Sequence, residues 1–225
     1  MDSLLSWLAV AGVLSALLCA ARWLLRGRRD ALGGIVGFPK ITVMILLVLS
    51  AAAAYPGVAR RHTEDRLGKV ASAIAGTSVQ VTCQTMSGAA LDSGAEAGYV
   101  NWGPDGEPER VAHIKWEQCK LLRAYMRSDK RHPSPAQYSA VHVLTHEAVH
   151  TSGVKSESLT ECKAVQRDAT TARLLGASDH DARTLARLYW LGVYPQMPAD
   201  YRDAGCGPGG ALDEHLPTSP WAAGT

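Results

Sequence analysis

The sequence predicts an α+β protein in which two transmembrane helices come first, then a small β-sheet, and then a helical core. Two long apolar runs lie near the N-terminus of the 225-residue chain. Short alternating segments between about residues 79 and 115 are typical of strands. The sequence after them carries the capping residues and glycines that begin and end helices.

Each apolar run is long enough to cross a bilayer as a helix. The first covers residues 4–25, and the second extends from about residue 38 to residue 56. A cleaved signal peptide is the alternative, because the alanines at 51–54 resemble a cleavage region. The first run has no basic residues before it, and there are two runs rather than one, so two spans are the favoured interpretation.

The short loop between the runs is basic and sets the predicted topology. By the positive-inside rule its arginines place it in the cytoplasm, so that both chain ends face outward: Arg26, Arg28 and Arg29. We therefore expect a two-span cell-membrane protein with a transmembrane hairpin over residues 1–57. An extracytoplasmic domain follows over residues 58–225.

Net charge excludes one class of partner. The chain carries a formal charge of +2, from 23 basic and 21 acidic side chains. Five of the basic and two of the acidic side chains lie in residues 1–57, so the remainder is almost neutral. Nucleic-acid binding needs a basic patch, which this pattern does not predict. We expect the lipid bilayer as a partner and no nucleic acid.

Four cysteines lie in the predicted soluble domain, and none forms a Cys-x-x-Cys pair: Cys83, Cys119, Cys162 and Cys206. In an oxidising compartment two disulfides are the natural interpretation, and four unrelated thiols are the alternative. We expect Cys83–Cys119 to tie a strand to a helix and Cys162–Cys206 to attach the C-terminal tail to a later helix. Spacing alone leaves the other pairings open.

The secondary structure of this domain follows from local signals. Strands are expected at residues 79–83, 99–102 and 111–115, and helices at 62–75, 117–128, 134–152, 157–175 and 179–191. Ser134 and Pro135 are typical of a helix start, and Gly153 and Gly176 of helix ends.

The run His146-Glu147-Ala148-Val149-His150 lies within the helix predicted at 134–152. Residues four apart share one helix face, so the two imidazoles can occupy adjacent corners of a zinc tetrahedron. Glu147 can reach a water on an open corner and accept its proton as the water attacks a carbonyl carbon. The run therefore predicts a zinc ion (Zn2+) with Glu147 as general base.

Two carboxylates follow on the next helix. The short break at Gly153 makes the two helices antiparallel, which brings Glu157 opposite His150 and Glu161 opposite His146. We expect Glu157 to bind the zinc and Glu161 to accept a hydrogen bond from a ligand histidine. The reverse assignment stays open. His142, one turn before His146, is expected to be an ordinary helix-surface residue, and the alternatives are a substrate contact or a residue that supports a metal ligand.

Together, His-Glu-x-x-His and the following Glu-x-x-x-Glu resemble the gluzincin class of zinc metallopeptidases over about residues 135–170. The resemblance implies a zincin-like core, with two histidines and a downstream glutamate as ligands and an acidic residue that orients the first histidine. The interval between His150 and Glu157 is much shorter than in well-known gluzincins, so this is a minimal version. The chain is also similar to small actinobacterial membrane-anchored proteins of unassigned function.

The resemblance also implies two further features. An edge strand upstream of the motif would align the substrate, and residues 111–115 are the candidate, with a plain structural strand as the alternative. A later tyrosine or histidine would stabilise the oxyanion. The sequence does not choose among four candidates for this role: His180, Tyr189, Tyr194 and Tyr201.

The function expected is that of a membrane-anchored zinc metallopeptidase that cleaves a peptide or protein substrate outside the cytoplasmic membrane. The alternative is a non-catalytic membrane protein in which zinc merely staples two helices together. A structural site of that kind is closed by four protein ligands, whereas a catalytic site leaves one position open.

Overall fold

The computed structural model describes residues 2–25 and 37–222, and the chain divides into two compact units, Met1–His62 and Thr63–Thr225. The division falls inside a helix, a little beyond the predicted boundary between residues 57 and 58. The arginines predicted to form the cytoplasmic loop lie outside the described residues: Arg26, Arg28 and Arg29.

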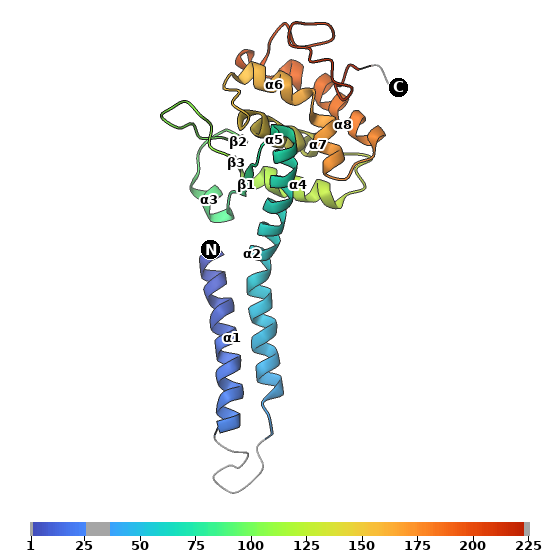
Figure 1. Ribbon diagram of the computed structural model, residues 1–225. Helices are drawn as coiled ribbons and strands as arrows, with labels where there is room; N and C mark the ends of the chain where they lie inside the picture. Colours follow the sequence, from blue (N-terminus) through green and yellow to red (C-terminus); the bar gives the residue numbers. More distant parts are fainter. Residues whose placement is uncertain (1, 26–36, 223–225) are drawn as a thin grey trace, which may run out of the picture. The chain divides into compact units, whose positions relative to one another are not determined.

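Two helices, α1 (Asp2–Leu25) and α2 (Lys40–Ala75), are long and apolar enough to cross a membrane. Within the first unit they run side by side (Figure 1) and approach closely at Gly12, where an added Cβ would lie 2.2 Å from Ser50 Oγ. The helix predicted to begin at residue 62 is not separate, because α2 continues through Pro56. A proline inside a helix removes one backbone hydrogen bond, and here that loss does not end the helix.

The second unit is a mixed α+β domain. After α2 its elements are β1 (Gln80–Cys83), α3 (Met86–Leu91), β2 (Gly98–Tyr99), β3 (Val111–Ile114), α4 (Trp116–Arg127), α5 (Pro135–His150), α6 (Glu157–Val165), α7 (Asp168–Leu174) and α8 (Asp179–Gly192). Two short 3-10 turns follow, η1 (Tyr194–Gln196) and η2 (Ala199–Tyr201).

The sheet has the order β1-β3-β2, with β1 parallel and β2 antiparallel to β3. The strand expected to be a substrate-aligning edge, residues 111–115, is therefore in the middle of the sheet, and that interpretation was wrong. Its backbone groups already pair with a strand on each side. The edge strand that contacts α5 is β2.

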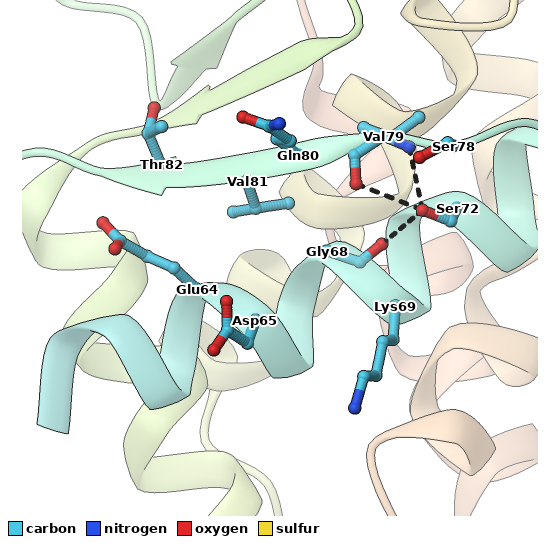
Figure 2. A pocket seen from close by; sticks show the side chains of 10 residues that line it. All are labelled: Glu64, Asp65, Gly68, Lys69, Ser72, Ser78, Val79, Gln80, Val81 and Thr82. Carbon is cyan, nitrogen blue, oxygen red and sulfur yellow. Dashed lines mark hydrogen bonds between the residues drawn. The ribbon is translucent and has the colours of Figure 1, made fainter. Parts of the chain in front are cut away.

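The last turns of α2 cover the outer edge of β1 (Figure 2). Ser72 Oγ accepts a hydrogen bond from Val79 N and donates to Val79 O, at 2.9 and 3.1 Å. Glu64 Oε1 accepts from Cys83 N at 2.9 Å, and Gly68 between them leaves room for the strand. Because these three residues are spaced by four, they share one helix face. Side chains on that face therefore provide hydrogen-bond partners for backbone groups along the outer edge of β1.

Helix α5 is the central element of the domain and contacts β2, β3, α4, α6, α7 and α8. Its start is as predicted: Ser134 and Gln137 form a capping box, and Pro135 is the first helical residue. It ends before Gly153, which has a φ of 101°. Nearly every side chain from Ala140 to His150 is buried.

The helix predicted at residues 157–175 breaks into α6 and α7. At the break, the buried Gln166 side chain donates to Leu212 O and accepts from Glu214 N, at 2.9 and 2.8 Å. These bonds to the tail are non-local, so helical periodicity could not predict the break. The structure also joins Cys83 to Cys119 and Cys162 to Cys206, which are the pairs that sequence analysis favours.

Candidate metal centre

The candidate site lies where α5 and α6 face each other. His146 contacts Glu161, while His150, one turn later on α5, contacts Glu157, one turn earlier on α6. This crossed pattern of contacts shows that the two helices run antiparallel. Gly153 and the Ser156 cap, whose side chain accepts from Leu159 N, make the tight connection between them.

Three side-chain atoms converge at the end of α5: His146 Nε2, His150 Nε2 and Glu157 Oε2. The two nitrogens are 3.0 Å apart, and they lie 3.1 and 3.4 Å from the carboxylate oxygen. A tetrahedral zinc with bonds of about 2.0–2.1 Å separates its ligand atoms by about 3.3 Å. The triangle therefore has the size of three corners of a zinc tetrahedron.

The outer nitrogens of both rings fix which atoms face the triangle. His150 Nδ1 is 2.7 Å from the carbonyl oxygen of Val154, which can only accept, so Nδ1 carries the hydrogen. His146 Nδ1 likewise donates to Glu161 Oε2 at 3.0 Å. In the neutral rings both Nε2 atoms are then lone-pair acceptors. When both rings are neutral, three acceptors face one another at close range, and either a metal cation between them or a proton on His146 resolves that arrangement.

The negative charge of Glu157 also favours a bound cation between the three ligand atoms. In the metal-free protein, hydrogen bonds to Glu157 and Glu161 raise the pKa of His146 to about 8 in spite of its burial, so its Nε2 can carry a proton there. Hydrogen bonds to His146 and His150 in turn lower the pKa of Glu157 to about 2, so Glu157 is a carboxylate at neutral pH. Its side chain is 40% exposed, whereas the two histidines are almost completely buried. The triangle is thus open to solvent on the Glu157 side. Among the described residues this ligand group has three members, which leaves a fourth position free.

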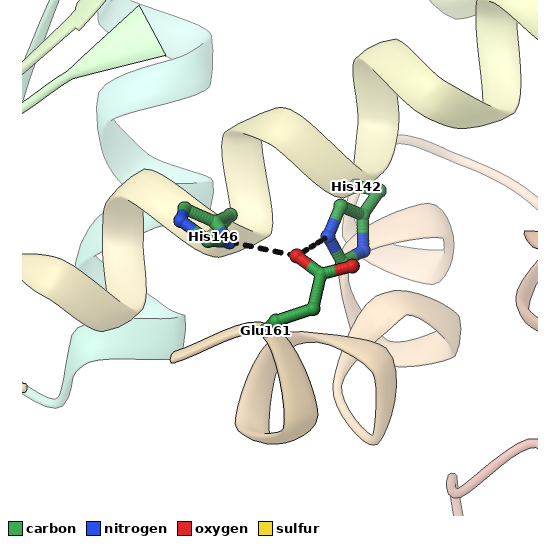
Figure 3. A group of neighbouring side chains, drawn as sticks. All are labelled: His142, His146 and Glu161. Atoms are coloured by element: carbon green, nitrogen blue, oxygen red, sulfur yellow. Dashed lines mark hydrogen bonds and ion pairs between the residues drawn. The ribbon is translucent and has the colours of Figure 1, made fainter. Parts of the chain in front are cut away.

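Behind His146 lies a second group of potential ligands, formed with His142 and Glu161 (Figure 3). Glu161 Oε2 accepts from His142 Nε2 at 2.9 Å as well as from His146, and Glu161 Oε1 accepts from Tyr189 Oη at 2.8 Å. Glu161 is 1% exposed, so this group offers no open position. The geometry fits a carboxylate that orients His146 better than it fits a second metal.

His142 is not the helix-surface residue that the sequence favoured, because it is 3% exposed. Its Nδ1 donates to Asp168 Oδ2 at 2.8 Å, and its ring stacks on Tyr189 with centroids 3.7 Å apart. Burial lowers its pKa, but the charges of Asp168 and Glu161 outweigh burial and raise it to about 10. A buried imidazolium therefore balances two buried carboxylates.

Asp168 is not among the site residues that the sequence predicts. Its position in the first turn of α7 resembles an ordinary acidic residue at a helix start. The available signal was its spacing of seven from Glu161, which corresponds to two helical turns. That signal was weak because the helix is interrupted between the two residues.

Glu147 is 5% exposed, and its Oε2 has no hydrogen-bond partner among the described residues. Burial raises its pKa to about 7. Its carboxylate lies against the backbone of Gly98 on β2, where an added Cβ would be 2.8 Å from Glu147 Cγ. An unpaired buried carboxylate oxygen is costly, so a partner such as a water or a substrate atom is expected there.

A cavity of about 290 Å³ adjoins Glu147 and His146. Its walls come from residues 95–98, from the α5 face with Val143, from single side chains on α6 and α8, and from the tail with Met197, Pro198 and Tyr201. Tyr201 stacks against His146, with ring centroids 5.9 Å apart.

The four residues predicted as candidates to stabilise the oxyanion have different surroundings in the structure. His180 is exposed on α8, and Tyr194 Oη bonds to the backbone of Asp203. Tyr189 lines the cavity, but its hydroxyl is taken by Glu161. Tyr201 lines the same cavity and stacks on a histidine of the triangle, so it is the candidate that the geometry favours.

Comparison with known proteins gives this site no relative. No family model matches the chain, and no curated protein or solved structure matches it either.

Proposed function

We propose that this protein is a membrane-anchored zinc metallopeptidase of the gluzincin type, with His146, His150 and Glu157 as metal ligands. The observation that carries the proposal is the triangle of three acceptor atoms with the unpaired Glu147 carboxylate oxygen beside it. A structural zinc would have a fourth protein ligand, and the ligand group among the described residues has three members.

Zinc bound there would lower the pKa of a water on the remaining position and polarise a peptide carbonyl. Glu147 Oε2 would accept the proton of the attacking water and pass it to the leaving amine. Burial, followed by the nearby charge of Glu157, raises the pKa of Tyr201 to about 12, so Tyr201 stays a neutral donor. Its hydroxyl stabilises the oxyanion.

The proposed location of the domain is outside the cytoplasmic membrane. Two disulfides support it, because disulfides persist in oxidising compartments. A C-terminal fusion to a phosphatase that is active only after export tests this location. An inactive fusion in intact cells would contradict it.

The experiment that tests the activity uses the full chain purified in detergent and loaded with zinc. A mixture of synthetic peptides is incubated with wild type and with Glu147→Gln, and cleavage is followed by mass spectrometry. We expect the variant to keep its zinc and to cleave at least about 10²-fold more slowly, because it lacks the general base. Equal cleavage by both proteins would exclude the mechanism.

A parallel measurement of metal content tests the site itself. Wild type is expected to bind one zinc per chain, and His150→Ala is expected to lose it. Equal zinc in both proteins would exclude the triangle as the metal site. Stoichiometric zinc without any peptide cleavage would favour the non-catalytic alternative.

A further inference from the structure

One wall of the cavity beside Glu147 is an exposed segment of chain, residues 92–98, here called the strap. Four of its residues line the cavity: Ala95, Glu96, Ala97 and Gly98. Residues 92–96 are exposed, so packing contributes little to holding them. The strap therefore depends on specific polar contacts for its position.

Lys115, directly after β3, makes most of those contacts. Its Nζ pairs with Asp92 Oδ2 at the start of the strap and with Glu96 Oε1, 3.0 Å away, near its middle. Its backbone N–H donates to Ala97 O at 3.0 Å. The lysine side chain is only 12% exposed, although both carboxylates that it contacts are more exposed. One residue thus attaches the strap at three points.

The rest of the strap is held at its ends. Gln84 Nε2 donates to Asp92, and Gly98 pairs with Ile114 in the β2–β3 register. Between these ends, the ion pair of Lys115 with Glu96 and the hydrogen bond from Lys115 N to Ala97 O hold the strap. The carboxylates of the two Lys115 ion pairs are 31% and 48% exposed, so each pair stabilises the strap only modestly, and the two pairs act together.

The position of the strap matters because Gly98 touches the general base. With an added Cβ at Gly98 only 2.8 Å from Glu147 Cγ, the backbone has no room to move closer. If the strap moved away, the cavity would lose the wall formed by Ala95 and Ala97, and Glu147 would become open to solvent. The strap therefore sets both the width of the cavity and the environment of the carboxylate.

We propose that Lys115 is a positioning residue, which holds the strap against the site so that the cavity can bind one substrate side chain next to Glu147. This inference rests on the proposed function, because the cavity is a substrate pocket only if the triangle holds zinc. Lys115 acts through the strap: its ion pairs among the described residues are with Asp92 and Glu96 and not with the ligands or Glu147.

The test uses two hydroxamates on the zinc-loaded full chain. Acetohydroxamic acid can bind the metal alone, whereas leucine hydroxamate also places a side chain in the cavity. We expect Lys115→Met to weaken binding of leucine hydroxamate by about tenfold, because the side chain loses part of its pocket. Binding of acetohydroxamic acid is expected to stay unchanged. Lys115→Arg keeps the positive charge and is expected to bind leucine hydroxamate as tightly as wild type does. Unchanged binding of both probes, or equal weakening of both, would overturn the proposal.

Hydrogen exchange gives a second measurement that needs no ligand. Amides of residues 95–98 are expected to exchange faster in Lys115→Met than in wild type, while amides of α5 do not change. Lys120→Met is the matched control, because the ion pair of Lys120 within the described part of the chain is with Glu117 on the exposed face of α4. Equal exchange of the strap in all three proteins would also overturn the proposal.

The two proposals fail in different ways. If wild type cleaves no peptide but its strap still depends on Lys115, the peptidase function fails and the positioning role of Lys115 remains. If wild type cleaves peptides and Lys115→Met has the same KM and kcat, the role of Lys115 fails and the peptidase function remains. A rise in KM with little change in kcat supports both.

Discussion

Glu157 and Glu161 contact opposite nitrogens of the same imidazole ring. Glu157 Oε2 is 3.1 Å from His146 Nε2, on the open side of the site, and Glu161 Oε2 is 3.0 Å from His146 Nδ1, on the buried side. The two carboxylates lie one turn apart on α6, so a single helix holds one carboxylate that could bind a metal ion and one that orients the neighbouring histidine. Their different burial gives them different roles.

The first prediction separates those roles. Glu157→Ala is expected to weaken zinc binding more than Glu161→Gln, because the first removes a ligand and the second removes only an orienting hydrogen bond. Loss of an orienting partner costs about 10–100-fold in metal affinity. Competition with a chromogenic chelator measures both affinities, and circular dichroism checks that each variant is folded. The opposite ranking would assign the ligand role to Glu161.

The second prediction concerns the buried charge of His142 in metal-free protein. Its pKa is raised from 6.5 to about 10, so its stabilising contribution is complete below about pH 6.5 and disappears as the pH rises through 10. His142→Gln leaves two buried carboxylates without their cation and should destabilise the protein by about 3–5 kcal/mol near neutral pH. Urea unfolding of both proteins in EDTA between pH 6 and 10 measures the difference. A difference that does not shrink with rising pH would contradict the charged state of His142.

The third prediction concerns the contact between Gly98 and Glu147. Gly98→Ala places a Cβ 2.8 Å from Glu147 Cγ and Oε1, so either β2 or the carboxylate must shift. Peptide cleavage is expected to fall by about tenfold or more, because small displacements of catalytic groups are costly. Gly192→Ala, near the end of α8, is the matched control, since its Cβ would meet only the Tyr138 hydroxyl at an ordinary contact distance of 3.7 Å. Equal activity in the two variants would show that the contact is unimportant.

The fourth prediction compares the two disulfides. They enclose loops of similar length, with separations of 36 and 44 residues, so loss of either is expected to cost a similar amount, about 2–5 kcal/mol. Only Cys162–Cys206 holds the tail segment with Tyr201. Replacing that pair by alanines should therefore reduce peptide cleavage more than replacing Cys83–Cys119. Thermal unfolding and cleavage rates measure the two effects, and equal losses of activity would contradict a role for the tail.

Much of the candidate site could be predicted from local sequence. The i, i+4 spacing places His146 and His150 on one face, and the Gly153 stop with the Ser156 cap gives the tight turn that brings Glu157 and Glu161 back toward them. These features depend on helix geometry and capping, which are set by neighbouring residues. The length and composition of the two apolar runs are enough to predict two helices that could cross a membrane, and the structure contains both helices.

Other parts of the site depend on contacts between distant segments. The order of the sheet placed residues 111–115 in its middle and made β2 the strand beside Glu147, because strand pairing is a non-local choice. The sequence favoured a surface position for His142, but in the fold its ring is bonded to Asp168 and Glu161. The strap, held by Lys115, has no periodic pattern that a sequence could display.

The sequence by itself determined that a His-Glu-x-x-His helix is followed by a second helix with two carboxylates, in a chain with two apolar spans. Only the tertiary structure decided which carboxylate is exposed and which is buried, that His142 lies between Asp168 and Glu161, and that Tyr201 and the strap border the site. The physical reason is that helix periodicity and capping are local, whereas burial and ion pairing depend on which distant side chains fill the same space.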